Sequence, residues 1–301
     1  TADPKLSYDG FTLKTVGDSL AIVGGIRGVI YGVYELLEKL GCRFFTPLCE
    51  KIPSTVDIEL PQLDETQIPV LEYRQHNYTD FNKYPRFGTK SRLNAGKLPE
   101  YMGGGIQYAW FVHSFEPQIL DPKEWYDTHP EYFSLVNGKR VNEFAQLCLT
   151  NPDVQRIAIE KVRAALRAHP ECRIISVSQN DWDNHCECEN CAKLDAQEGS
   201  SAGTLINFVN NIAEAIEEEF PEVIVDTLAY QYTRPATSHL RPRHNVCVRL
   251  CSIEACFAHS FEDCDDKSRW VKRPDGTTSN FIHDLEDWGK VCNRMYIWDY
   301  T

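Results

Sequence analysis

The chain has 301 residues, of which 42% are hydrophobic and 25% are charged, values typical of a globular protein. Its formal net charge of -13 argues against a nucleic-acid partner, because such binding needs clustered Lys and Arg. No apolar run approaches the roughly 20 residues of a membrane helix. We therefore expect neither nucleic-acid binding nor a membrane span. The aromatic content of 11% suits stacking on sugar rings, and filling a core is the commoner use of any single aromatic residue.

The first 61 residues predict a small α/β domain. Residues 6–25 are typical of a β-hairpin with its turn at Gly17-Asp18, and a helix and the strand-like sequence CRFFTP follow. Gly41 would end that helix. The apolar positions at helical spacing are Val29, Val33, Leu36, Leu37 and Leu40. Because a lone hairpin and helix leave one sheet edge open, we expect this domain to be truncated at its N-terminus.

From about residue 62 onward, strands alternate with helices. Helices are predicted at about 152–168, with Asn151 as N-cap, and at about 202–219 and 280–290. An Asn137-Gly138 turn predicts an inserted hairpin. The apolar strands begin near Leu71, Ala109, Ile174, Val223, Val246 and Met295. This alternation predicts an α/β fold with a parallel sheet, and we expect residues 62–301 to form a (β/α)8 TIM barrel that is cropped after its sixth strand.

Polar and aromatic side chains follow these strands where the active site of a barrel gathers. Asp181 and Glu254 each come shortly after an apolar strand, and they form the strongest candidate pair of catalytic carboxylates. The other residues at strand ends are His113, Ser114, Asn180, Tyr230, Tyr232, Trp298, Asp299 and Tyr300. Two carboxyl groups with aromatic platforms are what hydrolysis of a glycosidic bond requires. Asp183 and Asp299 are the next carboxylates to consider.

Several segments resemble known glycosidase families. The sequence GGIRGVIYGVYELLEKLGCRFF is similar to the small α/β domain that precedes the barrel in α-glucuronidases and β-N-acetylhexosaminidases. CLTNPDV, SVSQNDWDNHCECENC and RLCSIEACFAH together resemble the group of domains of unknown function numbered 4838. That group includes glycoside hydrolase family 163, whose members are endo-β-N-acetylglucosaminidases acting on complex N-glycans.

The resemblance implies a retaining, substrate-assisted mechanism on β-linked N-acetylglucosamine. It implies that Asp181 orients the acetamido group and that Glu254 is the general acid and base, although these two roles could be exchanged. Asn180 would then hydrogen-bond the acetamido group or a hydroxyl. The expected substrate-binding residues are His113, Asn180, Tyr230, Tyr232, Trp298 and Asp299. The expected partner is a glycan, and the expected location is extracytoplasmic: periplasmic, surface or secreted.

Cys186, Cys188 and Cys191 form a C-x-C-x-x-C motif, whose spacing lets three thiolates converge on one tetrahedral ion. A structural zinc site would need a fourth ligand, with His185, Cys251, Cys256 and Cys264 as candidates. Disulfides in an oxidising compartment are the second interpretation, with Cys148 and Cys172 as further partners. Free thiols are the third. No cofactor is expected in the catalytic step.

Other functions remain open. A Cys–His enzyme would pair a cysteine with His113 or His259, but nothing in the sequence orients such a pair. A barrel that binds carbohydrate without cleaving it is the alternative from another class, and the presence of both Asp181 and Glu254 argues against it. A glycosidase acting on another sugar, such as glucuronic acid, is the third alternative.

Overall fold

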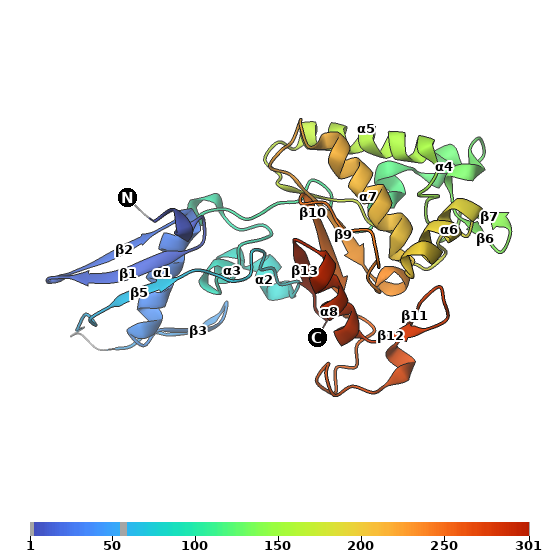
Figure 1. Ribbon diagram of the computed structural model, residues 1–301. Helices are drawn as coiled ribbons and strands as arrows, with labels where there is room; N and C mark the ends of the chain where they lie inside the picture. The colour runs from blue at the N-terminus through green and yellow to red at the C-terminus, as the bar shows by residue number, and fades with distance from the viewer. Residues whose placement is uncertain (1–2, 55–58, 301) are drawn as a thin grey trace. The chain divides into compact units, whose positions relative to one another are not determined.

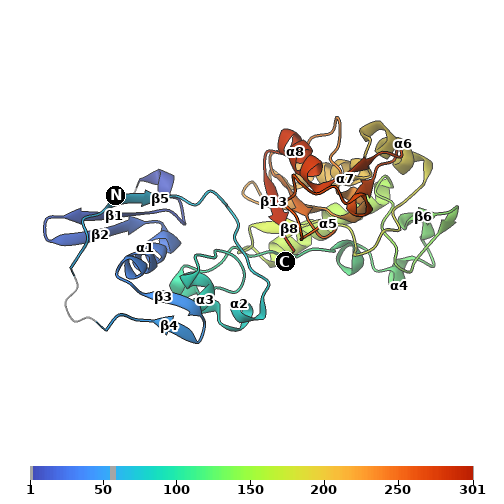
Figure 2. The same ribbon diagram turned by 90° about the horizontal axis from the view of Figure 1, so that it is seen from below.

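The computed structural model describes residues 3–54 and 59–300. It is a mixed α/β protein, and its chain divides into two compact units, Thr1–Gln107 and Tyr108–Thr301 (Figures 1 and 2). The domain boundary between residues 61 and 62 stays a prediction. Within the described residues, every helix is too short or too polar to cross a membrane.

The first unit contains a three-stranded antiparallel sheet in the order β2-β1-β5, with α1 packed against it (Figure 2). The predicted turn at Gly17-Asp18 is confirmed, and Gly17 has the positive φ of 59° that the turn needs. The elements of this unit are β1 (Phe11–Val16), β2 (Ser19–Gly24), α1 (Ile26–Lys39), β3 (Arg43–Thr46), β4 (Cys49–Lys51), β5 (Asp64–Gln67), α2 (Thr79–Lys83) and α3 (Pro85–Lys90).

The buried face of α1 differs from the predicted one. Val29 and Val33 are 38% and 41% exposed, whereas Gly28 and Gly32 are buried. A Cβ at position 28 would lie 2.0 Å from the backbone oxygen of Gly10, so only glycine allows this close approach. The helix therefore packs through its smallest residues, which a search for apolar side chains at helical spacing passes over.

The strand predicted near Leu71 is wrong, since residues 70–75, all described, form no strand. The side chain of Asn94, instead of a neighbouring strand, forms hydrogen bonds with the backbone of this segment. Its Oδ1 accepts the N–H of Arg74 at 2.7 Å, and its Nδ2 donates to the carbonyl of Glu72 at 2.7 Å. One side chain thus satisfies backbone groups that a ladder of hydrogen bonds would otherwise pair.

The second unit is built on a four-stranded parallel sheet in the order β13-β10-β9-β8, of which Figure 1 labels β13, β10 and β9. The strands predicted near Ile174, Val223, Val246 and Met295 are confirmed as parallel neighbours in that order. The strand predicted near Ala109 is reduced to a parallel bridge between Tyr108 and Ile174. The cropped TIM barrel stays a prediction.

The elements of this unit follow those of the first in chain order: α4 (Pro122–Trp125), β6 (Leu135–Val136), β7 (Lys139–Arg140), α5 (Pro152–Ala168), β8 (Ile174–Ser176), α6 (Glu189–Glu198), α7 (Ala202–Ile216), β9 (Ile224–Ala229), β10 (Val246–Cys251), β11 (Val271–Lys272), β12 (Thr278–Ser279), α8 (Phe281–Val291) and β13 (Met295–Trp298). Asn151 caps α5 as predicted, accepting the N–H of Asp153 at 2.9 Å. The predicted hairpin turn at Asn137-Gly138 joins β6 and β7.

The two faces of the sheet differ in character. Alternate residues of β10 contribute Val246, Val248 and Leu250 to apolar cores that include buried residues of α7 and α8. On the opposite face the buried Arg249 forms an ion pair with Asp226 at 3.2 Å. The candidate carboxylates lie in the loops that follow β8 and β10, two strands of this sheet.

Candidate active site and cysteine cluster

The carboxyl ends of the four parallel strands meet at one edge of the sheet, and predicted site residues follow each of them. Asp181 lies beyond β8, Tyr230 directly follows β9, Glu254 lies beyond β10 and Asp299 directly follows β13. Because β9 separates β8 from β10, the two candidate catalytic carboxylates come from non-adjacent strands. This is the arrangement expected from the strand-end argument.

Two tyrosines lie among the candidate site residues, and one of them contacts Asp181 directly. The Tyr230 hydroxyl donates to Asp181 Oδ1 at 2.7 Å. Burial, and then the Asp181 carboxylate, raise the pKa of the Tyr230 phenol, which therefore stays a hydrogen-bond donor. Burial also raises the pKa of Tyr300, with the charges of Cys251, Asp181 and Glu254 adding to the effect. Tyr300 thus lies within electrostatic range of both carboxylates.

Glu254 is held by an arginine that the sequence did not single out. The Arg234 side chain is fully buried, and its Nη1 donates to Glu254 Oε2 at 3.1 Å. Its Nε donates to Asp284 Oδ2 at 2.7 Å, and its Nη2 donates to the carbonyl of Ser279 at 2.9 Å. Because a guanidinium stays charged, the contact with Glu254 is an ion pair whenever Glu254 is ionised.

Asp181 and Glu254 line different pockets. Asp181 borders one of about 320 Å³ together with His113, Glu116 and Trp182. Glu254 borders one of about 700 Å³ whose lining includes Tyr232. The sequence reasoning missed Glu116, although it follows the predicted strand near Ala109. Burial, and then the Asp121 charge, raise the pKa of Glu116, so Glu116 holds its proton to a higher pH than a free glutamate.

Two of the predicted site residues are engaged with the backbone. The Asn180 side chain accepts the N–H of Glu116 at 3.0 Å and donates to the carbonyl of Ala145 at 2.8 Å. His113 has a positive φ of 58°, and its Nδ1 lies 2.8 Å from the carbonyl oxygen of Gln179. These contacts give Asn180 a role in holding its own loop.

The remaining predicted residues are aromatic platforms and one acid. The Tyr232 ring stacks on His185 with centroids 4.8 Å apart, and Trp298 stacks on Tyr300 at 5.9 Å. Asp299 accepts a hydrogen bond from the Ser252 hydroxyl at 2.9 Å. Of the two stacked pairs, Tyr232 and His185 line the same pocket as Glu254.

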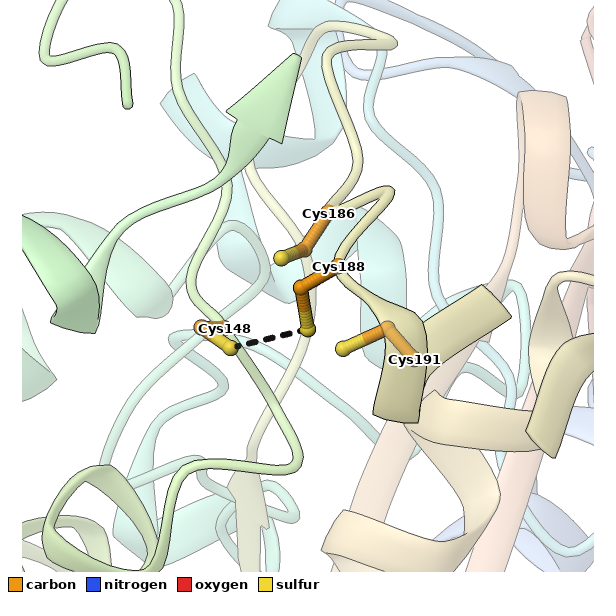
Figure 3. A group of neighbouring side chains, drawn as sticks. All are labelled: Cys148, Cys186, Cys188 and Cys191. Atoms are coloured by element: carbon orange, nitrogen blue, oxygen red, sulfur yellow. Dashed lines mark hydrogen bonds between the residues drawn. The ribbon is translucent and has the colours of Figure 1, made fainter. Parts of the chain in front are cut away.

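The three cysteines of the C-x-C-x-x-C motif converge as predicted, and Cys148 joins them (Figure 3). All four sulfurs lie within 4.8 Å of one another, and the group could hold a metal ion. The fourth member is therefore Cys148, which the sequence predicts only as a disulfide partner, and not one of the four predicted candidates for the fourth ligand. Of those candidates, His185 stacks on Tyr232 instead. The twelve cysteines, all within the described residues, have free thiols.

The four thiols share charge unevenly. Hydrogen bonds from Cys186 and Cys191 hold the pKa of Cys148 well below its usual range. The same Cys148 thiolate raises the pKa of Cys186 to about 11 and also raises that of Cys191. Four thiols at this distance cannot all ionise without a cation between them, so the group suits a metal better than solvent.

The sequence matches a family described as a domain of unknown function, DUF4838, over residues 44–301. The chain belongs to this family. No curated protein matches it. Both candidate carboxylates and all four clustered cysteines lie within the residues that match DUF4838.

This DUF4838 chain has a second group of possible ligands in the loop after Glu254. Cys256, His259 and Cys264 place their ligand atoms within 4.8 Å of one another, and Cys256 Sγ lies 3.2 Å from His259 Nδ1. Hydrogen bonds from the Ala258 backbone and then from His259 lower the pKa of Cys256. This is the contact that the Cys–His alternative requires, on an exposed loop.

Proposed function

We propose that the protein is a glycoside hydrolase that cleaves β-linked N-acetylglucosamine in glycans by a retaining, substrate-assisted mechanism. The observation that carries this proposal is the placement of Asp181 and Glu254 beyond the carboxyl ends of two strands of one parallel sheet, where Tyr230 donates a hydrogen bond to Asp181 and Arg234 pairs with Glu254. Two carboxylates with different surroundings are what acid–base cleavage of a glycosidic bond requires.

In the proposed reaction the acetamido oxygen of the substrate attacks the anomeric carbon as the glycosidic bond breaks. Glu254 protonates the departing glycosidic oxygen, and in the second step it removes a proton from the water that opens the cyclic intermediate. Asp181 accepts the amide N–H of the substrate and stabilises the positive charge that develops on the acetamido group. The Tyr230 hydroxyl, 2.7 Å from Asp181, fixes the orientation of that carboxylate.

One contact favours the exchanged assignment of the two roles. A general acid must carry a proton, and the buried Arg234 guanidinium 3.1 Å from Glu254 pairs with the ionised carboxylate. In that case Glu254 would orient the acetamido group, and Asp181 would protonate the leaving oxygen. Substrates with different leaving groups separate the two assignments, because a good leaving group needs little protonation.

The surroundings suit a large neutral glycan. The pocket of about 700 Å³ beside Glu254 has room for more than one sugar ring, and the Tyr232–His185 stack lies at its wall. We place the enzyme outside the cytoplasm, where complex N-glycans are encountered. No cofactor takes part in the proposed chemistry, and the metal we propose for the cysteine cluster is zinc, with a structural role.

The test is incubation of the full-length protein with a released complex N-glycan and weighing of the products by mass spectrometry. A cut inside the chitobiose core supports the proposal. Binding without cleavage would favour the carbohydrate-binding alternative, and release of glucuronic acid from a suitable substrate would favour the other glycosidase. Inhibition by iodoacetamide that Cys256→Ser abolishes would favour the Cys–His alternative.

Two variants then assign the roles. If Glu254 is the acid, Glu254→Gln loses turnover of the natural glycan by about 100- to 10,000-fold and retains more activity on an activated aryl glycoside. Asp181→Asn slows both substrates alike, because the cyclic intermediate forms whatever group leaves. The opposite pattern establishes the exchanged assignment.

A further inference from the structure

The four cysteine sulfurs lie close enough together to bind one metal ion. A zinc–sulfur bond of about 2.3 Å places the sulfurs of a tetrahedral site about 3.8 Å apart. The Cys148 and Cys188 sulfurs are 3.6 Å apart, and all four lie within 4.8 Å of one another (Figure 3). A disulfide would require a sulfur–sulfur distance of about 2.05 Å.

The surroundings of the cluster stabilise negative sulfur. The backbone N–H of Leu135 donates to Cys186 Sγ at 3.4 Å, and Arg140 Nη1 lies 3.6 Å from the same sulfur. The Thr150 hydroxyl is 3.1 Å from Cys191 Sγ. Donors of this kind are the usual outer partners of thiolate ligands, and the Arg140 charge offsets part of the excess negative charge of four thiolates on a divalent ion.

We propose that Cys148, Cys186, Cys188 and Cys191 bind one zinc ion through four thiolates, and that this ion fastens the segment that carries Asp181. Four soft sulfur ligands in a tetrahedral arrangement select zinc over magnesium or calcium. The zinc site does not depend on the proposed glycosidase activity.

The fastening role follows from the two segments that supply the ligands. The Gln146 side chain, two residues before Cys148, accepts the N–H of Asn180 at 2.9 Å and donates to the carbonyls of Asn180 and Trp182. The stretch around Gln146 therefore supports the loop on both sides of Asp181. Cys148 lies two residues after Gln146, and the other three ligands lie after the Asp181 loop. The zinc ion would therefore connect the two segments a second time, beyond the hydrogen bonds of Gln146.

The test measures zinc per chain in the protein purified without chelator. We expect about one equivalent at this site, lost in Cys148→Ser and retained in Cys172→Ser, which changes a buried free cysteine outside the cluster. Cys264→Ser, which removes one possible ligand of the second group, should also retain the zinc of the first. Exchange for cobalt should give the thiolate charge-transfer and visible bands of a tetrahedral sulfur site.

Hydrogen exchange tests the fastening. In Cys148→Ser, amides of residues 180–191 should exchange faster while those of β9 and α7 keep their protection. If Cys148→Ser does not fold, a mercurial titration of the wild-type protein should release the zinc as the thiols react. Zinc content unchanged by Cys148→Ser, or a metal-free protein whose cluster cysteines are paired in disulfides, overturns the zinc site. Unchanged exchange at residues 180–191 overturns the fastening role.

Discussion

Two substitutions at the Arg234 ion pairs should separate stability from activity. Asp284 and Arg234 are both completely buried and lie 2.7 Å apart, whereas the Glu254 side chain is 24% exposed. Asp284→Asn keeps an oxygen for Arg234 Nε but removes the buried charge, which leaves the guanidinium with the partly exposed Glu254 as its only carboxylate partner. Breaking a buried pair in this way costs about 3–5 kcal/mol. Glu254→Gln keeps an oxygen for the 3.1 Å contact and leaves the Asp284 pair intact, so we expect a loss of about 1 kcal/mol.

The assay can follow the second unit alone, because all six tryptophans lie within Tyr108–Thr301. At about 2–4 °C per kcal/mol for a unit of this size, Asp284→Asn should lower its fluorescence-detected Tm by roughly 10 °C. Glu254→Gln should shift the Tm by only a few degrees.

Turnover should show the opposite order. Glu254→Gln should lose about 100- to 10,000-fold if Glu254 transfers a proton. Asp284→Asn, assayed well below its Tm, should lose far less. An Asp284→Asn protein as stable as the wild type would refute the assignment of Asp284 as the main partner of Arg234, and near-normal activity of Glu254→Gln would mean that Glu254 is not catalytic.

Three further predictions concern other parts of the molecule. Burial raises the pKa of Asp195 from 3.8 to about 7, so folding favours its protonated form. Stability should therefore fall as the pH rises from about 4 to 7. At 1.36 kcal/mol per pKa unit, the free energy of unfolding should fall by up to about 4 kcal/mol. Asp195→Asn should remove most of this dependence on pH in urea titrations, and at pH 8 it should be more stable than the wild type. Gly28→Ala should destabilise the first unit by about 1–3 kcal/mol, measured by hydrogen exchange. In the control, Gly289→Ala, the added Cβ meets no described atom within 4 Å, so stability should rise by up to about 1 kcal/mol. Tyr230→Phe removes the hydrogen-bond donor to Asp181, and a hydrogen bond to a charged group is worth about 1.5–3 kcal/mol, so glycan turnover should fall by roughly 10- to 100-fold. Unchanged turnover would show that Tyr230 has no role in the reaction.

The parts of the fold that local signals specify were predictable. The cap at Asn151 starts α5 at the predicted residue, and the strands near Val223 and Val246 are buried along almost their whole length, as their apolar residues predict. The segment near Leu71 was not predictable, because its backbone pairs with one side chain from residue 94. Apolar residues show that a segment can be a strand, but a strand also needs a partner that the sequence does not place.

The same distinction applies to the site. The strand-end argument finds Asp181 and Glu254 because it uses only their position along the chain. Arg234 lies as far beyond β9 as Asp181 lies beyond β8, but a search for acids and aromatic residues passes over a buried arginine. Cys148 lies before α5, away from the carboxyl end of any strand of the sheet, so a search of strand ends cannot find it. The two carboxylates are supported differently: Glu254 pairs directly with a buried guanidinium, whereas the loop of Asp181 is hydrogen-bonded to Gln146, two residues before the clustered Cys148. Loss of the proposed zinc ion should therefore disturb Asp181 and leave Glu254 in place. In the proposed mechanism, the step that slows without zinc should be the one that depends on Asp181, which is formation of the cyclic intermediate.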